Sequence, residues 1–239
     1  MPLPDRIPSH AGWDFGAFWC PIRSVAGDFY DFYPLGPGRL GVVIADVSGK
    51  GIPAALFMAL SVTVLRYGMS LDLPPDQVLR QANEMIISEQ RSRMFATTFV
   101  GYLSLRSGEL RYACGGHNPA LWYHAAEGTV DYVTAQGVAV GIFKGADFDL
   151  ARLRLQPGDV FVLYTDGITE VLNQDEEEFG EERLEKLIQQ HHALPAQALA
   201  ERILEAVNTF AGAQELFDDA TLVVIKRTGE SAGAEAPPS

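Results

Sequence analysis

The chain has 239 residues, of which 47% are hydrophobic and 21% are charged, and its formal net charge is -13. These proportions are typical of a soluble globular protein with a sizeable core, and the acidity argues against nucleic acid or anionic membranes as partners. Residues 1–8 show no secretion signal, no apolar run of about 18 residues predicts a membrane-inserted helix, and the two cysteines lack metal-type spacing. We therefore expect a cytoplasmic protein without membrane insertion, with Cys20 and Cys114 as reduced core thiols.

Ten segments have the composition or alternation of β-strands. In chain order they are 13–19, 28–33, 40–45, 97–105, 110–114, 120–124, 130–134, 150–155, 160–164 and 220–226. Four segments are predicted to be helices, namely 53–67, 75–91, 181–190 and 195–210. Pro53 and Pro75 suit the first turn of a helix, where a missing N–H costs nothing. Because 53–67 is apolar nearly all round, we expect that helix to be buried between layers.

Many strands with short connections, together with two pairs of helices, predict an α+β layered sandwich. The strands and helices do not alternate as a doubly wound sheet requires. We assign residues 1–12 to an N-terminal lead-in, 13–227 to one domain, and 228–239 to a disordered tail that is rich in Gly, Ala, Pro and Ser.

Aspartates stand at the ends of several predicted strands. Asp46 and Asp166 each share a strand face with the alternate apolar residues before them, and Asp218 precedes the last strand. Asp28 begins the second strand, and Asp31 points to the opposite face. If these strand ends meet, each carboxylate pair would repel by roughly 4 kcal/mol at 4 Å with an effective dielectric near 20, so the group requires protonation or cations. Turn formation alone explains any one Asp-Gly, but the whole set favours an all-oxygen site for Mg²⁺ or Mn²⁺.

Six motifs occur in a specific order along the chain. They are G-D-F-Y-D at Gly27, A-D-V-S-G-K-G at Ala45, T-T-F-V-G-Y-L at Thr97, G-G-H-N-P at Gly115, T-D-G-I-T-E at Thr165 and D-D-A-T-L-V-V at Asp218. Together they resemble the PPM-type, type 2C-like metal-dependent serine/threonine protein phosphatases, in their bacterial SpoIIE-type branch. The resemblance covers residues 13–226 and implies a four-layer α-β-β-α sandwich, in which two antiparallel β-sheets are flanked by helix pairs.

The resemblance also implies two Mn²⁺ or Mg²⁺ ions per site and a set of ligands for them. Asp46 would bridge both ions, and the backbone carbonyl of Val47 would add a ligand. Asp28 would bind one ion, while Asp166 and Asp218 would bind the other. The catalytic residues are accordingly expected to be Asp28, Asp46 and Asp166.

Four further residues have expected roles around these ligands. Asp31 and Asp219 are expected to support the ligands from behind. Lys50 either assists the phosphate or is a solvated loop lysine. His117 either donates a proton to the leaving group or fixes a turn by hydrogen bonding. The phosphate-binding arginine of the eukaryotic enzymes has no evident counterpart in the sequence.

The function implied by the resemblance is hydrolysis of phosphoserine or phosphothreonine by direct attack of a metal-bridged hydroxide. In this branch the expected substrate is a phosphorylated anti-sigma-factor antagonist in a partner-switching pathway, and an upstream sensor domain is a further expected partner. One alternative is a non-catalytic phosphatase-like domain that binds such a partner, although every expected carboxylate is present. Another alternative is a metal-dependent phosphoesterase that acts on small molecules.

Overall fold

The computed structural model describes residues 6–22, 26–89, 94–212 and 218–229, so residues 1–5 of the predicted lead-in and 230–239 of the predicted tail lie outside the described residues. The elements in these ranges are β1 (Trp13–Cys20), β2 (Phe29–Pro34), β3 (Arg39–Val47), α1 (Ile52–Ser70), α2 (Pro75–Glu89), β4 (Ala96–Ser104), β5 (Glu109–Gly115), β6 (Ala120–His124), β7 (Thr129–Val133), β8 (Ala151–Arg154), β9 (Val160–Tyr164), α3 (Asp166–Thr169), α4 (Gly180–His191), α5 (Ala196–Ala211) and β10 (Ala220–Arg227). Each predicted strand and helix is found. The short helix α3 was not predicted, because four residues carry no helical periodicity.

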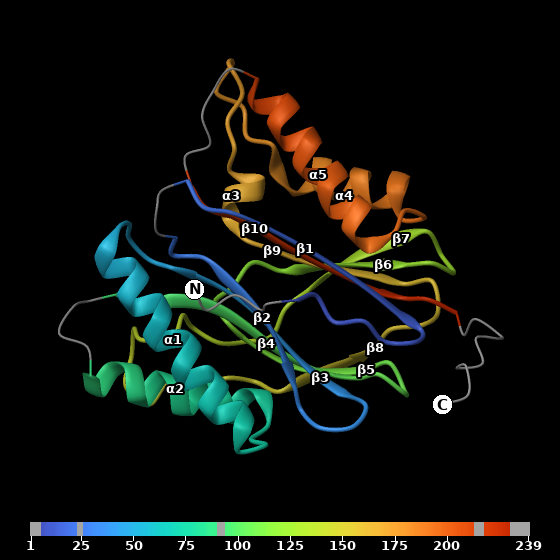
Figure 1. Cartoon of the computed structure of the whole chain (residues 1–239). Coiled ribbons are helices and arrows are strands. Elements are labelled where there is room, and N and C mark those ends of the chain that lie inside the picture. The colour runs from blue at the N-terminus through green and yellow to red at the C-terminus, as the bar shows by residue number, and fades with distance from the viewer. Residues whose placement is uncertain (1–5, 23–25, 90–93, 213–217, 230–239) are drawn as a thin grey trace.

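The strands form two antiparallel sheets that face each other (Figure 1). The β3 sheet has the order β2-β3-β4-β5-β8, and the β9 sheet has the order β1-β10-β9-β6-β7. The cluster between them includes Phe99 of β4 and Phe161 of β9, whose ring centroids are 6.1 Å apart. The expectation of two antiparallel sheets is therefore confirmed.

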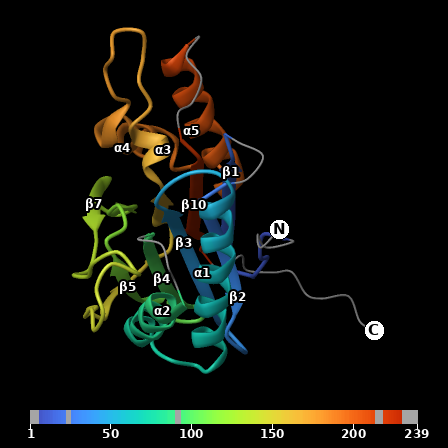
Figure 2. The same ribbon diagram turned by 90° about the vertical axis from the view of Figure 1, so that its left-hand side faces the viewer.

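Helix pairs cover the outer faces of both sheets (Figure 2). Helices α1 and α2 pack on the β3 sheet, and α4 and α5 pack on the β9 sheet. A separate cluster of buried apolar side chains fills the space between the two sheets and the space between each sheet and its helix pair. The predicted four-layer α-β-β-α sandwich is thus confirmed.

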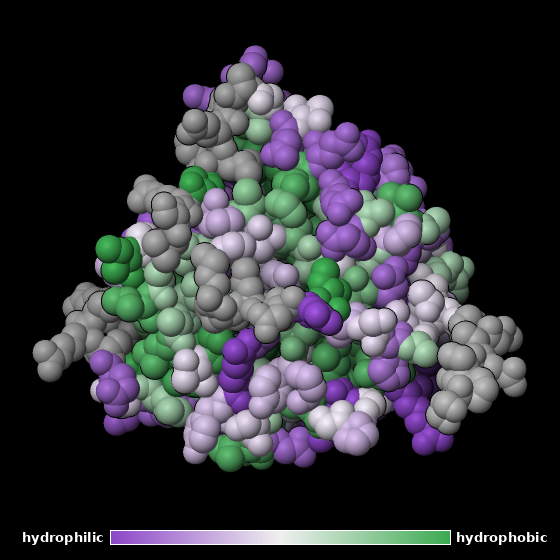
Figure 3. Space-filling model, viewed as in Figure 1, coloured by the Kyte–Doolittle hydropathy of each residue, from purple (hydrophilic) through white to green (hydrophobic). Residues whose placement is uncertain are grey.

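The prediction that the first helix is buried on all sides is wrong. Helix α1 is an outer layer, so only one side contacts the sheet, and the relative exposure of Ile52 is 70% and that of Leu56 is 68%. Figure 3 shows apolar residues on the surface where α1 begins. Among the described residues, α1 is also the one helix long and apolar enough to cross a membrane, judged by its 19 residues and mean hydropathy of 1.5. Half of that stretch is buried inside the protein.

Candidate metal centre

The pairing of β2 with β3 places two aspartates opposite each other. The last pair in register is Phe29 with Ala45, and the next residues along the two strands are Asp28 and Asp46. Alternation directs Asp46 to the inner face of the β3 sheet, the same face as the buried Ile44. Asp28 is 2% exposed, so its carboxyl group has almost no contact with water.

The β9 sheet supplies the other two aspartates from turns. Asp166 opens α3 directly after β9, and Asp218 precedes β10. A Cβ atom on Gly167 would lie 2.0 Å from the carbonyl oxygen of Asp219, so a side chain at this position would force the two segments apart. The Asp-Gly pair is therefore required by the close approach of the two backbones.

We predicted that Asp46 and Asp166 each reach the centre by continuing a strand face, and this is wrong for Asp166. The alternate residues Val160, Val162 and Tyr164 of β9 pack towards α4 and α5, whereas Asp46 faces the space between the sheets. Asp166 thus reaches the centre because the chain turns after β9, and a continued strand face does not explain its position.

Two threonines join Asp28 to the β9 sheet. The hydroxyl of Thr165 donates to Asp28 Oδ2 at 2.6 Å, and the hydroxyl of Thr221 donates to the same oxygen at 2.9 Å. The backbone N–H of Thr221 in turn donates to Thr165 Oγ1 at 3.0 Å. These contacts fix one oxygen of Asp28, and the Asp28 side chain also forms a hydrogen bond with Asp46. Sequence reasoning missed both threonines, although each lies inside a quoted motif, T-D-G or D-D-A-T.

The electrostatics of the centre favour a bound cation. Burial, followed by the charge of Asp46, raises the pKa of Asp28 well above its usual value. Burial and then the charge of Asp166 raise the pKa of Asp46 to about 6. The pKa of Asp166 is raised as well, by burial and then by Asp218. The charges of four aspartates are therefore felt within one site, and each resists ionisation of its neighbours.

Lys50 supplies a positive charge at the same site. Its Nζ lies 2.8 Å from Asp218 Oδ2, and its charge also acts on Asp166 by lowering that pKa. The residue lies in the loop between β3 and α1, where Gly49 and Gly51 have φ angles of 87° and 80°. Those angles belong to the left-handed region that glycine adopts without strain.

The residues fit hard divalent cations by their donor chemistry. Among the described residues, no group of three His, Cys, Asp or Glu side chains is close enough together to hold a metal ion. Asp218 instead forms an ion pair with Lys50. The group nevertheless offers only oxygen donors with an excess of negative charge, which suits Mn²⁺ or Mg²⁺. The carbonyl oxygen of Val47 lies close to Gly27, the residue before Asp28, at the edge of this group.

Asp219 lies behind the centre. Its Oδ1 accepts a hydrogen bond from the N–H of Ile22 at 2.9 Å, and its Oδ2 accepts one from the N–H of Gly27 at 2.7 Å. It thereby holds the backbone that leads into Asp28.

The structure does not bring Asp31 to the ligands. Asp31 lies on the outer face of the β3 sheet. Its carboxylate accepts hydrogen bonds from Nε and Nη2 of Arg66 on α1, at 2.6 and 3.1 Å. Its carboxylate is buried and this bidentate pair satisfies it. The expectation that Asp31 supports the ligands is therefore corrected, because the residue fastens α1 to β2.

His117 is buried between β4 and β9, close to Thr97 of one sheet and the backbone of Tyr164 of the other. Its Nδ1 is 3.0 Å from Thr97 Oγ1, and Thr97 is the register partner of Asp46. Burial lowers the pKa of His117 to about 4. A contact with the backbone of Tyr164 raises the pKa of His117, but by less than burial lowers it. The Nε2 atom of His117 has no hydrogen-bond partner among the described residues. A neutral imidazole is a poor proton donor, so the geometry favours the hydrogen-bonding interpretation.

Comparison with known proteins agrees with this geometry. The family Stage II sporulation protein E (SpoIIE) matches residues 36–228. The chain is 33% identical to the phosphoserine phosphatase RsbU of Bacillus subtilis over 94% of its own length and 66% of that protein. It is 30% identical to the protein IcfG of Synechocystis over 94% of its length and 39% of that protein. It therefore spans less than two thirds of the length of these relatives.

A solved structure shares the fold. The RsbU and RsbW domains of a Mycobacterium tuberculosis protein superpose with a TM-score of 0.80 at 27% identity, over 92% of this chain and 61% of that one. Together with the order of the sheets and the clustered aspartates, these matches show that the chain belongs to the SpoIIE family.

Proposed function

We propose that the protein is a metal-dependent phosphatase that hydrolyses phosphoserine or phosphothreonine on another protein. The observation that carries the proposal is the convergence of Asp28 and Asp46 from one sheet with Asp166 and Asp218 from the other. The pKa of three of these carboxyl groups is raised, which indicates that the site is built to receive positive charge. Its relative RsbU is named a phosphoserine phosphatase.

The chain's own residues would hold two divalent ions and orient the reaction. The charges of Asp46 and Asp28 act on each other, and the charge of Asp166 also acts on Asp46, which supports Asp46 as a residue that would contact both ions. Asp28 would help to hold one ion, and Asp166 and Asp218 would help to hold the other. Two bound Mn²⁺ or Mg²⁺ ions would supply Lewis-acid chemistry, making water nucleophilic and offsetting charge on the phosphoryl group. The hydroxyls of Thr165 and Thr221 would hold one oxygen of Asp28 in place while the side chain binds an ion.

Lys50 would bind the phosphoryl group once Asp218 is engaged elsewhere. Its side chain is half exposed, pairs with Asp218 and lies in a glycine-flanked loop, which supports this role. A lysine there would partly replace the arginine that has no counterpart in the sequence. If Lys50→Ala leaves both the rate and the substrate affinity intact, this role is excluded.

The proposed substrate is a phosphorylated anti-sigma-factor antagonist in a partner-switching pathway of the bacterial cytoplasm. The proposal rests on the resemblance to RsbU and on the SpoIIE family match. A sensor module outside this domain is the proposed source of regulation, because the relatives are longer than the matched region.

The decisive experiment measures phosphate release from a phosphorylated antagonist protein with Mn²⁺, and then with a chelator. We expect Mn²⁺-dependent release that Asp166→Asn and Asp46→Asn each nearly abolish with the fold intact. Asp175→Asn makes the same chemical change at an exposed residue outside the proposed ligand set, so this variant should retain activity. Full activity in either centre variant refutes the assignment. A parallel panel of small phosphate esters separates a protein phosphatase from a small-molecule phosphoesterase.

A further inference from the structure

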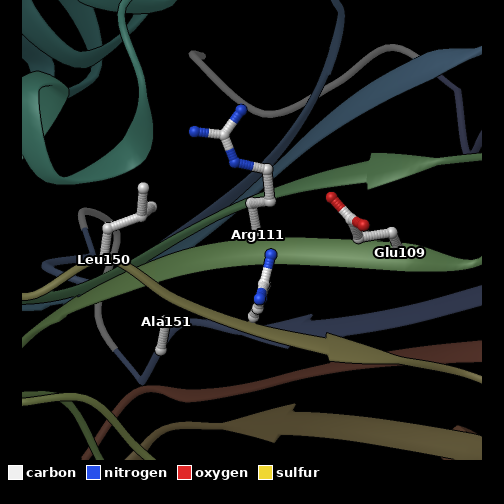
Figure 4. A pocket seen from close by; sticks show the side chains of 5 residues that line it. Glu109, Arg111, Leu150 and Ala151 are labelled. Atoms are coloured by element: carbon white, nitrogen blue, oxygen red, sulfur yellow. The ribbon is translucent and has the colours of Figure 1, made fainter.

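A second site is formed on the outer face of the β3 sheet, where β5 pairs with β8. A pocket of about 470 Å³ is lined by Glu109, Arg111, Leu150, Ala151 and Arg152 (Figure 4). Neighbouring residues of β5, such as Leu110 and Tyr112, face the space between the sheets, so Arg111 must project from the outer face. The pocket is therefore open to solvent beside the helix pair.

Two arginines of the pocket lie opposite each other. Arg111 of β5 and Arg152 of β8 are register partners in an antiparallel pair, and both side chains are exposed. Like charges directly opposite each other destabilise a sheet. Glu109 is not within ion-pair distance of either guanidinium, and within the described ranges neither arginine has a carboxylate partner. Glu109 is itself the register partner of Arg154.

The pocket is separate from the candidate metal centre. Arg111 is in register with Tyr102, and Tyr102 is in register with Gly41 of β3. Gly41 and Asp46 are five residues apart on the same strand, which corresponds to about 17 Å at the rise of a β-strand. The two sites also lie on opposite faces of the sheet, because Asp46 faces inward and Arg111 faces outward.

We propose that Arg111 and Arg152 form a binding site for the phosphate group of a small phosphorylated molecule. A guanidinium offers five N–H donors in a planar fork that matches an oxyanion. A phosphate has enough oxygens to accept from both forks at once, and its charge would turn their repulsion into attraction. A cavity of this volume suits a small ligand, and Leu150, which is 42% exposed, provides an apolar wall for the remainder of the molecule. This site lies beyond the proposed phosphatase reaction and does not depend on it.

The test uses the metal-free protein in EDTA, so that the metal centre offers no cation to phosphate. Calorimetric titration and thermal unfolding are recorded with inorganic phosphate and with ADP, against sodium chloride at equal ionic strength. We expect wild type to bind at least one of the two probes, and the probe that binds identifies free phosphate or a phosphate ester as the ligand. Arg111→Ala and Arg152→Ala should each weaken binding about tenfold or more. The exposed turn residue Arg106 gives the matched control, and Arg106→Ala should bind as wild type does.

A second measurement detects the site without a ligand. Because each variant removes one of two opposed positive charges, Arg111→Ala and Arg152→Ala should be at least as stable as wild type in urea when no phosphate is present. Unchanged phosphate affinity in both variants overturns the proposal. Binding that Asp46→Asn abolishes also overturns it, because the ligand then occupies the metal centre. Binding of polyglutamate in place of both phosphate probes overturns it in favour of an acidic protein surface.

Discussion

Replacing Asp46 with asparagine should stabilise the metal-free protein, although it removes a residue proposed to be essential for activity. In the folded chain this carboxyl group is largely buried and stands beside Asp28 and Asp166, with Asp218 also acting on it. When it ionises, it adds a negative charge to a site that already contains several. Asparagine keeps the shape of the side chain and removes that charge.

The size of the effect follows from the pKa of Asp46, which rises from 3.8 to about 6 on folding. At about 1.36 kcal/mol for each pKa unit, this corresponds to about 3 kcal/mol. Because the folded-state pKa is the higher one, the folded protein binds the proton more tightly than the unfolded chain. The penalty is therefore absent below about pH 4, grows between about pH 4 and 6, and is complete above about pH 6.

The assay is urea unfolding in EDTA of wild type, Asp46→Asn and the exposed control Asp175→Asn. At pH 7.5 we expect the free energy of unfolding of Asp46→Asn to exceed that of wild type by about 3 kcal/mol, and at pH 5 by about half as much. The control should follow wild type at both pH values. The reasoning is refuted if the free energy of unfolding of Asp46→Asn does not exceed that of wild type at pH 7.5. It is also refuted if the difference between the two proteins is no smaller at pH 5, because the charge of Asp46 is then not destabilising in the folded state.

Four further outcomes test the same centre and its attachments. Mn²⁺ at about 100 times its Kd should stabilise wild type by about 2.7 kcal/mol, measured as a rise in Tm that EDTA reverses; no rise contradicts the metal centre. Thr165→Val removes a hydroxyl donor from buried Asp28 and should cost about 1–3 kcal/mol in urea unfolding and weaken Mn²⁺ binding; unchanged values would mean that the contact is dispensable. Arg66→Met leaves the buried Asp31 carboxylate without its partner and should cost about 3 kcal/mol, part of which Asp31→Asn should recover; a single variant as stable as wild type contradicts this. Lys50→Met should destabilise the metal-free protein by at most about 1 kcal/mol while tightening Mn²⁺ binding, and equal or weaker binding would show that Lys50 does not compete for Asp218.

The strands could be predicted from sequence because each contains a local pattern. Alternation around residues such as Val42 and Ile44, bounded by glycine-rich turns, is set by neighbours within a few positions. The burial of α1 could not be predicted in the same way. Ile52 and Leu56 are apolar yet exposed, and only the position of the helix in an outer layer determines which side meets the sheet.

The proposed metal ligands could be predicted from the sequence, but the residues that hold them in place could not. Asp28 and Asp46 stand at strand ends, which periodicity locates. Their convergence with Asp166 depends on a turn after β9 that strand alternation does not describe. The partner of Asp31 lies 35 residues away on α1, and Thr221 lies 193 residues from Asp28. Such long-range contacts leave no local pattern and appear only when the two sheets are stacked.

The join formed by Thr165 and Thr221 has a mechanical consequence. Asp28 and Asp46 belong to one sheet and Asp166 and Asp218 flank strands of the other, and the hydroxyls of Thr165 and Thr221 connect the two sheets at Asp28. A shear of one sheet past the other would alter the spacing of Asp46 and Asp166 without breaking any main-chain bond within either. In the proposed phosphatase, a distant effector that biased the stacking of the two sheets would therefore change the spacing of the ligands.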